Sequence, residues 1–275
     1  MPLIPIASPD DPRLDPYRQL KQASDSASGF QPLVAEGEKL VRRLLESACP
    51  IHSLVVTPVV WERLAPDVPP HLPVYQLETP AVSQLVGFSF HRGALAHADP
   101  PPEPRLPELL QQVAGAADGL VVLCPELRDP TNLGTILRTA ASLNVDFVVA
   151  GRQGVWPFSR RVLRTSMGSV LKIPVVQTDD VATTAALFRA AGFELVATVL
   201  DDQAEDLAEL VPHPRRVLLL GNEDAGLAHD CLSNCDRRVT IPMSHGVDSL
   251  NVAVAAGIFL YHCQRTRTNR QRSSP

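Results

Sequence analysis

The chain has 275 residues, of which 45% are hydrophobic and 20% charged, and its formal net charge is -5. This hydrophobic content supports real cores in one large or two modest globular domains, and the negative charge excludes a protein that coats nucleic acid over its whole surface. The chain begins without a charged region followed by an apolar run, and no apolar stretch reaches membrane-spanning length, so we expect a cytoplasmic protein without membrane contact.

Residues 1–29 are rich in proline, aspartate and serine, which predicts an N-terminal extension that is partly disordered. Residues 30–97 alternate between helical and strand-like patterns, so they predict a small α/β domain with one sheet. Prolines then stiffen a linker and lead-in over residues 98–117.

A second domain begins near residue 118. The continuous apolar run Gly119 to Cys124 is typical of a strand buried on both faces of a parallel sheet. Helical and strand-like segments alternate from there to a final helix that restarts at Asp248 or Ser249, so the fold class is α/β with a parallel sheet. Helices are expected at 131–143, 159–167 and 180–191, and strands at 146–150, 172–176, 194–198, 216–220 and 237–241.

Three polar or glycine-containing turns follow strands of this sheet: Pro125 to Asn132, Gly221 to Gly226, and Met243 to Asn251. Ligands of parallel α/β sheets bind beyond the carboxyl ends of the strands, so these turns are expected to converge along one edge. No phosphate-binding loop of the Walker type and no GxGxxG fingerprint is present, which argues against a nucleotide phosphate as the ligand.

Most polar residues in these turns have an ordinary structural explanation when each is taken alone. Asp129 followed by Pro130 is a helix start, and Asn144 is suited to end that helix in a left-handed conformation. Ser249 reads as the cap of the final helix and Asn251 as a residue of its first turn. Gly221 permits close approach of backbone to a ligand.

Two further groups of residues bear on partners. Cys231 and Cys235 are the only closely spaced cysteines of the five, and without a second pair or a histidine cluster we expect reduced thiols and no metal. Basic residues gather in mid-chain and in the tail, which allows a confined site for a polyanion. These basic residues are Arg160, Arg161, Arg164, Arg265, Arg267, Arg270 and Arg272.

Three ordered segments, NLGTILRTA, GNEDAGL, and IPM followed by SLNVAVAAGI, resemble the motifs of the SpoU (TrmH-type) RNA ribose 2'-O-methyltransferases of the SPOUT superfamily. This resemblance implies a methyltransferase domain over residues 118–266 with a C-terminal trefoil knot, S-adenosylmethionine as cofactor, tRNA or rRNA as substrate, and a homodimer. VAEGEKLVRRLLES and GFSFHRGALA resemble the small RNA-substrate-binding domain that often precedes it, and residues 267–275 form a basic tail.

By similarity, Arg138 is the central catalytic residue, and four other residues orient substrate and cofactor around it. These four are Asn132, Glu223, Ser249 and Asn251. The cofactor-binding positions implied in the same way are Thr198, Gly221, Ile241, Met243 and Leu250. Because a guanidinium does not give up its proton in proteins, we expect Arg138 to hold a phosphate and stabilise a developing oxyanion.

The sequence departs from the family pattern at three positions: His245 and Asn144 stand where glycine is usual, and His262 where an acid is common. Two other functions stay open at this point. The chain could be a catalytically silent RNA-binding factor on the same fold, or a methyltransferase that acts on a base. Retention of the five polar motif residues argues against the first, and the Asn, Arg and Ser-Leu-Asn set favours ribose over base.

Overall fold

The computed structural model describes residues 3–18, 20 and 33–273, with the side chains of the last helix as far as Gln264. The chain divides into two units, each described separately below. The first unit comprises Met1–Pro102 and Phe158–Lys172, and the second comprises Glu103–Pro157 and Ile173–Pro275. Residues 158–172 therefore pack with the first unit, although in sequence they lie inside the methyltransferase domain expected at 118–266.

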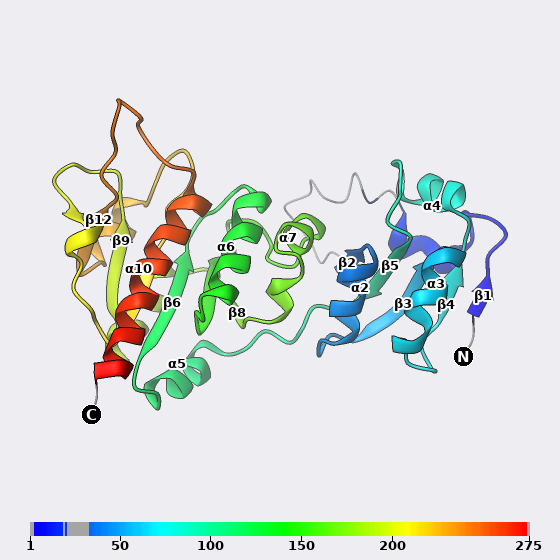
Figure 1. The fold of residues 1–275 in the computed structure, drawn as a ribbon, viewed down its shortest axis with the longest axis horizontal. Coiled ribbons are helices and arrows are strands. Elements are labelled where there is room, and N and C mark those ends of the chain that lie inside the picture. The colour runs from blue at the N-terminus through cyan, green and yellow to red at the C-terminus, as the bar shows by residue number, and fades with distance from the viewer. Residues whose placement is uncertain (1–2, 19, 21–32, 274–275) are drawn as a thin grey trace. The chain divides into compact units, whose positions relative to one another are not determined.

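The first unit is built on a mixed five-stranded sheet with the order β1-β4-β3-β5-β2 (Figure 1). β5 pairs antiparallel with β2 and β3, whereas β4 pairs parallel with β1 and β3. The strands are β1 (Leu3–Pro5), β2 (Leu33–Glu36), β3 (Ile51–Val56), β4 (Val74–Gln76) and β5 (Ala94–Ala98). The helices are η1 (Pro12–Tyr17), α2 (Glu38–Leu45), α3 (Pro58–Leu64), η2 (Ala65–Asp67), α4 (Thr79–Val86), α7 (Arg160–Thr165) and η3 (Ser169–Leu171).

The first residues of the chain are part of this unit, so the expectation of an N-terminal extension was wrong for β1 and η1. Leu14 and Tyr17 of η1 are fully buried. The Tyr17 hydroxyl donates to the carbonyl oxygen of Ser53 at 2.8 Å and accepts from the backbone N–H of His97 at 3.2 Å, which ties η1 to two strands. The part of the expected extension at residues 21–29 lies outside the described residues.

The second unit contains a seven-stranded sheet with the order β10-β12-β9-β11-β6-β7-β8, in which every pair of neighbours is parallel. The predicted parallel α/β sheet is confirmed. The strands are β6 (Gly119–Cys124), β7 (Phe147–Gly151), β8 (Val175–Thr178), β9 (Glu194–Thr198), β10 (Glu205–Asp206), β11 (Arg215–Leu219) and β12 (Arg237–Thr240). The helices are α5 (Leu106–Ala114), α6 (Pro130–Ser142), α8 (Val181–Ala190), η4 (Leu207–Glu209), α9 (His229–Ser233) and α10 (Val252–Ser273).

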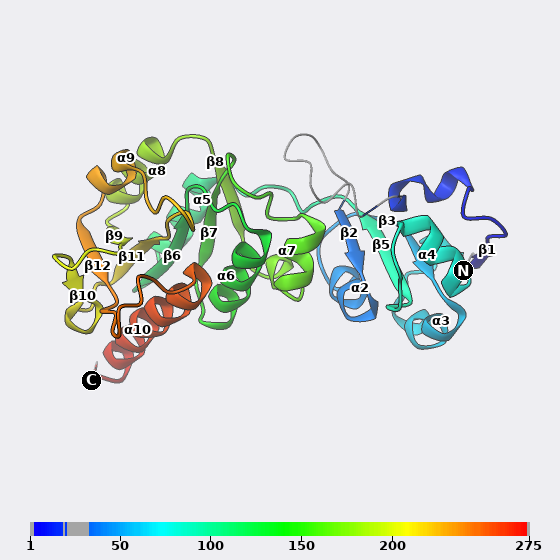
Figure 2. The same cartoon turned by 90° about the horizontal axis from the view of Figure 1, so that it is seen from above.

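Helices cover both faces of this sheet, with α6 and α10 side by side on one face and α5, α8 and α9 on the other (Figure 2). Such double coverage explains why β6 is buried at all six positions. α5 lies within the segment 98–117, which was expected to be a linker and lead-in. Its residues Leu109, Leu110 and Val113 pack into the sheet core.

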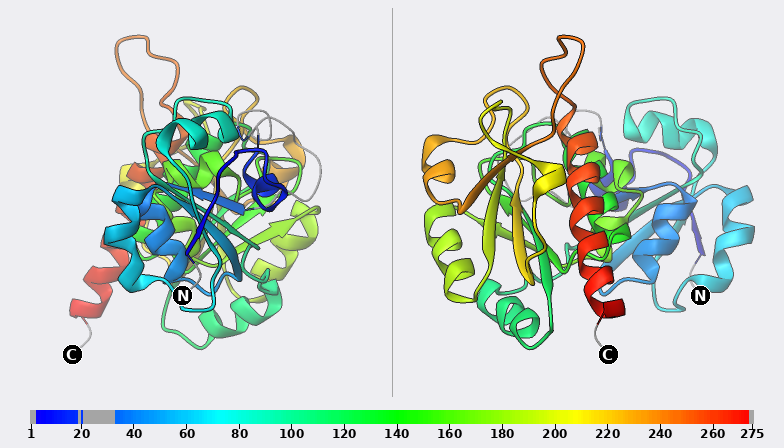
Figure 3. Two further views of the ribbon diagram at one scale, coloured as in Figure 1. Left: turned by 90° about the vertical axis from the view of Figure 1, so that its right-hand side faces the viewer. Right: turned by 60° about the vertical axis from the view of Figure 1, so that its left-hand side comes forward.

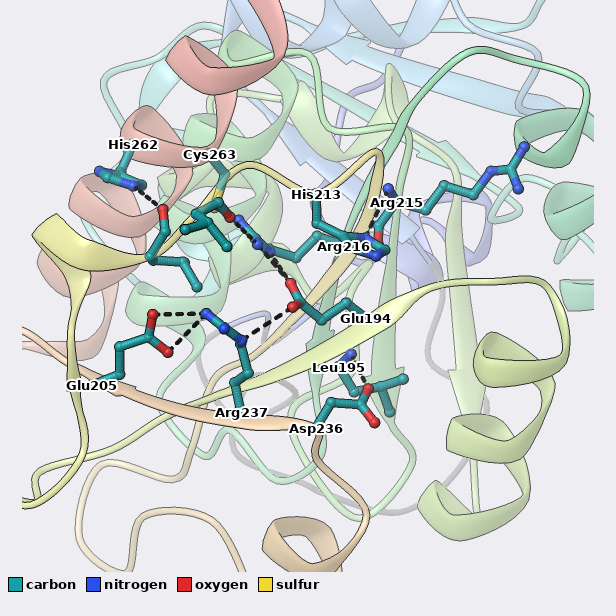
Figure 4. Close-up of polar contacts among 12 residues, drawn as sticks. Glu194, Leu195, Glu205, His213, Arg215, Arg216, Asp236, Arg237, His262 and Cys263 are labelled. Carbon is teal, nitrogen blue, oxygen red and sulfur yellow. Dashed lines mark hydrogen bonds and ion pairs between the residues drawn. The ribbon is translucent and has the colours of Figure 1, made fainter.

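A network of buried and partly buried ion pairs joins residues of four strands, β9, β10, β11 and β12 (Figure 4). Arg216 of β11 is 2% exposed, and its Nη2 lies 2.6 Å from Oε2 of Glu194 on β9. Arg237 of β12 pairs with the same Glu194 at 3.3 Å and with Glu205 of β10 at 2.7 Å. Because a buried charge is costly without a partner, this network fixes the strand order at the end of the sheet opposite the candidate site.

Among the described residues, no helix is long and apolar enough to cross a lipid bilayer. The left-handed conformation expected for Asn144 after α6 is confirmed by its φ of 54°. As backbone, α10 extends into the expected basic tail as far as Ser273, and the arginine side chains from residue 265 onward lie outside the described residues.

Candidate active site

The three polar turns meet at the carboxyl edge of the parallel sheet, as predicted. Asn132 donates from Nδ2 to Oε1 of Glu223 at 2.9 Å. Asn251 donates from Nδ2 to Oδ1 of Asn132, also at 2.9 Å. A continuous chain of side-chain hydrogen bonds therefore joins residues that are 91 and 119 positions apart in sequence.

The start of α6 presents Asn132 to this network. Asp129 caps the helix by accepting the N–H of Thr131 at 2.7 Å, and Pro130 occupies the first turn. Asn132 is then only 7% exposed. Glu223 also accepts the backbone N–H groups of Arg128 and Asp129, each at 3.3 Å, so its carboxylate binds the loop 221–226 to the start of α6.

The start of α10 is capped by Asn251. Its Oδ1 accepts the N–H groups of Ala253 and Val254 at 2.9 and 3.3 Å, and the helix begins at Val252. The expected start at Asp248 or Ser249 was wrong, as was the expected cap at Ser249, which is exposed in the preceding loop. The single amide of Asn251 thus both caps α10 and contacts Asn132, which unites the structural and the candidate functional role in one side chain.

A cavity of about 580 Å³ opens at this edge of the sheet. Its lining includes all five residues expected to bind cofactor, together with three of the five expected catalytic residues. These are Thr198, Gly221, Ile241, Met243, Leu250, Glu223, Ser249 and Asn251. Asn132 and Arg138 are not part of the lining, and Asn132 reaches it only through its hydrogen bonds to Glu223 and Asn251.

Arg138 lies apart from the other expected catalytic residues. It is exposed in the C-terminal half of α6, and its guanidinium makes no hydrogen bond or ion pair with any described residue. The adjacent Thr139 faces α10, where a Cβ added at Gly257 would lie 3.8 Å from the Thr139 methyl group. Arg138, expected to be the central catalytic residue, is therefore not brought to the cavity of its own chain.

Gly221 allows another backbone segment to approach closely. That segment is Gly226 of the same loop and not a ligand. A Cβ at Gly221 would lie 2.6 Å from the carbonyl carbon of Gly226. Asn222 and Gly226 exchange two backbone hydrogen bonds, at 2.8 and 3.0 Å, which close this loop. The Asn222 side chain donates to the carbonyl oxygen of Glu126 at 2.9 Å and so holds the loop against the turn after β6.

The sequence reasoning missed several lining residues, among them Leu200, Asp201, Arg238 and Phe259. Leu200 and Asp201 follow β9 at the same sheet edge, and that position after a parallel strand was the available signal. Leu200 is 67% exposed at the rim of this cavity.

Cys124 ends β6 close to the site and is fully buried. Burial, with a further contribution from the Glu223 carboxylate, raises the pKa of the Cys124 thiol far above its usual value. The thiol stays protonated at neutral pH, which excludes a thiolate nucleophile at this position. No group of three or more histidine, cysteine, aspartate or glutamate residues in the described part of the chain has the arrangement of a metal site.

His245 belongs to the loop between β12 and α10. This loop projects from the body of the second unit (Figure 3). Its φ of 59° is in the left-handed region, and its side chain is exposed. Glycine adopts this geometry without strain, which fits the expectation that glycine is usual at this position. A side chain with a Cβ pays about 1–2 kcal/mol in this region.

Replacement of His245 by glycine is therefore expected to raise the free energy of unfolding by about 0.5–1 kcal/mol, after the greater chain entropy of glycine is subtracted. Denaturant unfolding of the purified variant measures this. The matched control is His229→Gly in α9, an exposed histidine without positive φ, which should lower stability. A loss of stability in His245→Gly equal to that of the control would contradict strain at this residue.

Comparison with known proteins bears on this site. The model of the SpoU rRNA Methylase family matches residues 119–261. An uncharacterized tRNA/rRNA methyltransferase of Mycobacterium tuberculosis is 38% identical over 96% of this chain and 91% of its own. The 23S rRNA (guanosine-2'-O-)-methyltransferase RlmB of Acinetobacter baylyi is 32% identical over 68% of this chain and 76% of its own.

Among solved structures, the AdoMet-bound rRNA methyltransferase from Sinorhizobium meliloti superposes with a TM-score of 0.80 at 29% identity, over 96% of this chain and 98% of that one. The similarity thus extends through both units and includes every segment of the hydrogen-bonded network. The family match covers more than half of the chain, from β6 into α10. The chain belongs to the SpoU rRNA methylase family.

Proposed function

We propose that this protein transfers a methyl group from S-adenosylmethionine to a ribose 2'-hydroxyl of a structured tRNA or rRNA. The observation that carries the proposal is the network of Asn132, Glu223 and Asn251 beside the cavity. The relative from Acinetobacter baylyi, whose name specifies guanosine-2'-O methylation, supports ribose as the acceptor. The AdoMet-bound relative from Sinorhizobium meliloti supports the cofactor.

The lining of the cavity suits S-adenosylmethionine, which combines an aromatic base, polar groups and a positive sulfonium. Ile241, Leu250 and Phe259 offer apolar surface for the base. The carboxylate of Asp201 lines the same cavity and can attract the positive charge of the cofactor. When bound, this cofactor supplies a methyl group already activated for displacement. Thr198 is held in place because its hydroxyl donates to the carbonyl oxygen of Leu219 at 2.8 Å.

The chain's own contribution is to position the acceptor and exclude water, because direct methyl displacement gains most from orientation. Three N–H groups already donate to Glu223, so we assign this carboxylate to holding the turns in register. Ser249 and Asn251 orient cofactor and substrate at the start of α10. Arg138 binds the phosphate beside the acceptor ribose and stabilises the developing oxyanion.

We further propose a homodimer and a trefoil knot formed by the C-terminal segment. Val254 and Ile258, one turn apart on α10, are 53% and 40% exposed, which is unexpected for apolar residues of a helix that otherwise packs into the unit. A partner subunit on this face would cover them. Arg138 lies on the adjacent α6, outside the cavity of its own chain. In a homodimer, Arg138 could instead reach the cavity of the partner subunit.

Calorimetric titration of the wild-type protein with S-adenosylmethionine tests the proposal against a catalytically silent RNA-binding factor. We expect saturable binding with one site per chain, and we expect S-adenosylhomocysteine, the product, to compete. Absence of binding by a folded protein would favour the silent factor.

A further inference from the structure

A second cavity, of about 410 Å³, lies wholly within the first unit. It is bordered by the turn from β2 to α2, by Arg92 before β5, and by Arg164 and Met167 of the inserted segment 158–172. None of its lining residues belongs to the methyl-transfer site described above. Most of its lining residues carry a charge.

The acidic residues at this cavity are already engaged. Glu36 is only 4% exposed and pairs with Arg160 at 3.0 Å and with Arg92 at 3.4 Å. Glu38 pairs with Arg42 at 3.1 Å and with Arg63 at 2.8 Å. A buried carboxylate between two guanidinium groups serves to hold those cations in place.

Two more cations line the cavity without an acidic counterpart. Lys39 is exposed and Arg164 half-buried, and neither makes an ion pair with a described residue. The lining thus contains the three cations Lys39, Arg92 and Arg164 and the two carboxylates Glu36 and Glu38, and Arg160 pairs with Glu36 behind it. Burial lowers the pKa of the Arg160 guanidinium, and the neighbouring positive charges of Arg164 and Arg92 lower it further. The carboxylate of Glu36 acts in the opposite direction and raises this pKa.

The backbone adds to this positive field. α2 begins at the cavity, and no side chain caps its first turn. Its N-cap residue is Gly37, with a φ of 98°, and a Cβ there would lie 3.4 Å from the Arg92 side chain. The glycine thus lets Arg92 lie close against the start of the helix, whose N-terminus favours negative charge and already carries Glu38 in its first turn.

We propose that this cavity binds a backbone phosphate of the RNA, with Lys39, Arg92 and Arg164 as the contacting groups. The proposal rests on the proposed RNA substrate. The volume exceeds what a single phosphate needs, and Leu40 and Met167 give the lining apolar surface on which a ribose can pack. These two features favour a phosphate that belongs to a polynucleotide over a free anion. The contact neutralises phosphate charge and reads no base, so it supplies affinity and orientation.

The test measures binding of a fluorescein-labelled A-form RNA hairpin to the full chain over a range of KCl concentrations. Combined substitution of Arg164→Gln and Lys39→Gln is expected to raise Kd about tenfold at low salt and to reduce the slope of log K against log salt by about 1.5–2. Arg13→Gln, in the same unit but outside the cavity, is the matched control and should change neither quantity. The Arg164→Lys variant keeps the charge and should keep the salt slope.

Three further outcomes separate the possibilities. Equal Kd and salt slope in the double variant and the wild type would overturn the proposal, provided that the circular dichroism of the variant is native. Binding of inorganic phosphate that is lost in the double variant, with unchanged hairpin binding, would assign the cavity to a small anion and also overturn it. S-adenosylmethionine binding should be the same in wild type and double variant. If the wild type binds the hairpin through this cavity but transfers no methyl group, the proposed function fails and the phosphate site stands.

Discussion

Replacement of Arg138 by alanine is expected to lower the rate of methyl transfer about 1000-fold, because it removes the group proposed to stabilise the developing oxyanion. The affinity for S-adenosylmethionine should change less than twofold, since Arg138 does not line the cavity. Its guanidinium makes no hydrogen bond or ion pair with a described residue, so the free energy of unfolding should also be unchanged. Initial rates of labelled methyl incorporation into total RNA from a deletion strain measure the effect.

Arg105→Ala is the matched control for Arg138→Ala. Arg105 is an exposed arginine of the same unit whose side chain pairs only with the exposed Glu108 among described residues, and its loss should leave the rate unchanged. A rate near that of the wild type in Arg138→Ala would remove this residue from the mechanism. Loss of cofactor binding in the same variant would instead place Arg138 in the architecture of the cavity.

Asn132→Ala should lower methyl transfer about 100-fold by a different route. Asn132 is the middle member of the network, and without it Glu223 and Asn251 lose their connection. A shift of about 1 Å in a positioning group is enough for an effect of this size. The free energy of unfolding should also fall by about 0.5–1.5 kcal/mol, because two part-buried hydrogen bonds are lost while the partners Glu223 and Asn251 stay accessible to water.

Ser142→Ala on the same helix separates positioning from general damage to α6. The Ser142 hydroxyl donates only to the carbonyl oxygen of Arg138 and is exposed, so neither rate nor stability should change appreciably. Rates are compared well below the unfolding midpoint of Asn132→Ala. Full activity of a folded Asn132→Ala protein would show that the network does not position the reacting groups.

The sheet of the second unit was predictable because its strands are buried on both faces and its connections are helical. The unbroken apolar run 119–124 and the alternation after it left little choice of architecture. The convergence of three turns followed from the rule that parallel strands end at one edge, and the hydrogen bonds of Asn132 confirm it. Asn144 was predictable because few side chains tolerate its backbone geometry.

Other features depend on tertiary contacts that leave no local pattern. η1 is a short, proline-containing helix, and only the burial of Leu14 and Tyr17 against the first unit explains its order. α7 follows β7 in sequence, yet Arg160 pairs with Glu36 of the first unit. Ser249 and Asn251 are equally good caps in isolation, and the contact between Asn251 and Asn132 favours Asn251.

Identification of the methylated nucleoside tests the central claim most directly. Wild-type protein is incubated with total RNA from a deletion strain and S-adenosylmethionine carrying a deuterated methyl group, and the RNA is digested to nucleosides for mass spectrometry. The expected result is a single 2'-O-methyl nucleoside whose label stays with the ribose fragment and is absent when Arg138→Ala replaces the wild type. Label on a base fragment would contradict ribose methylation, and absence of label in every nucleoside would contradict RNA methylation of these RNAs.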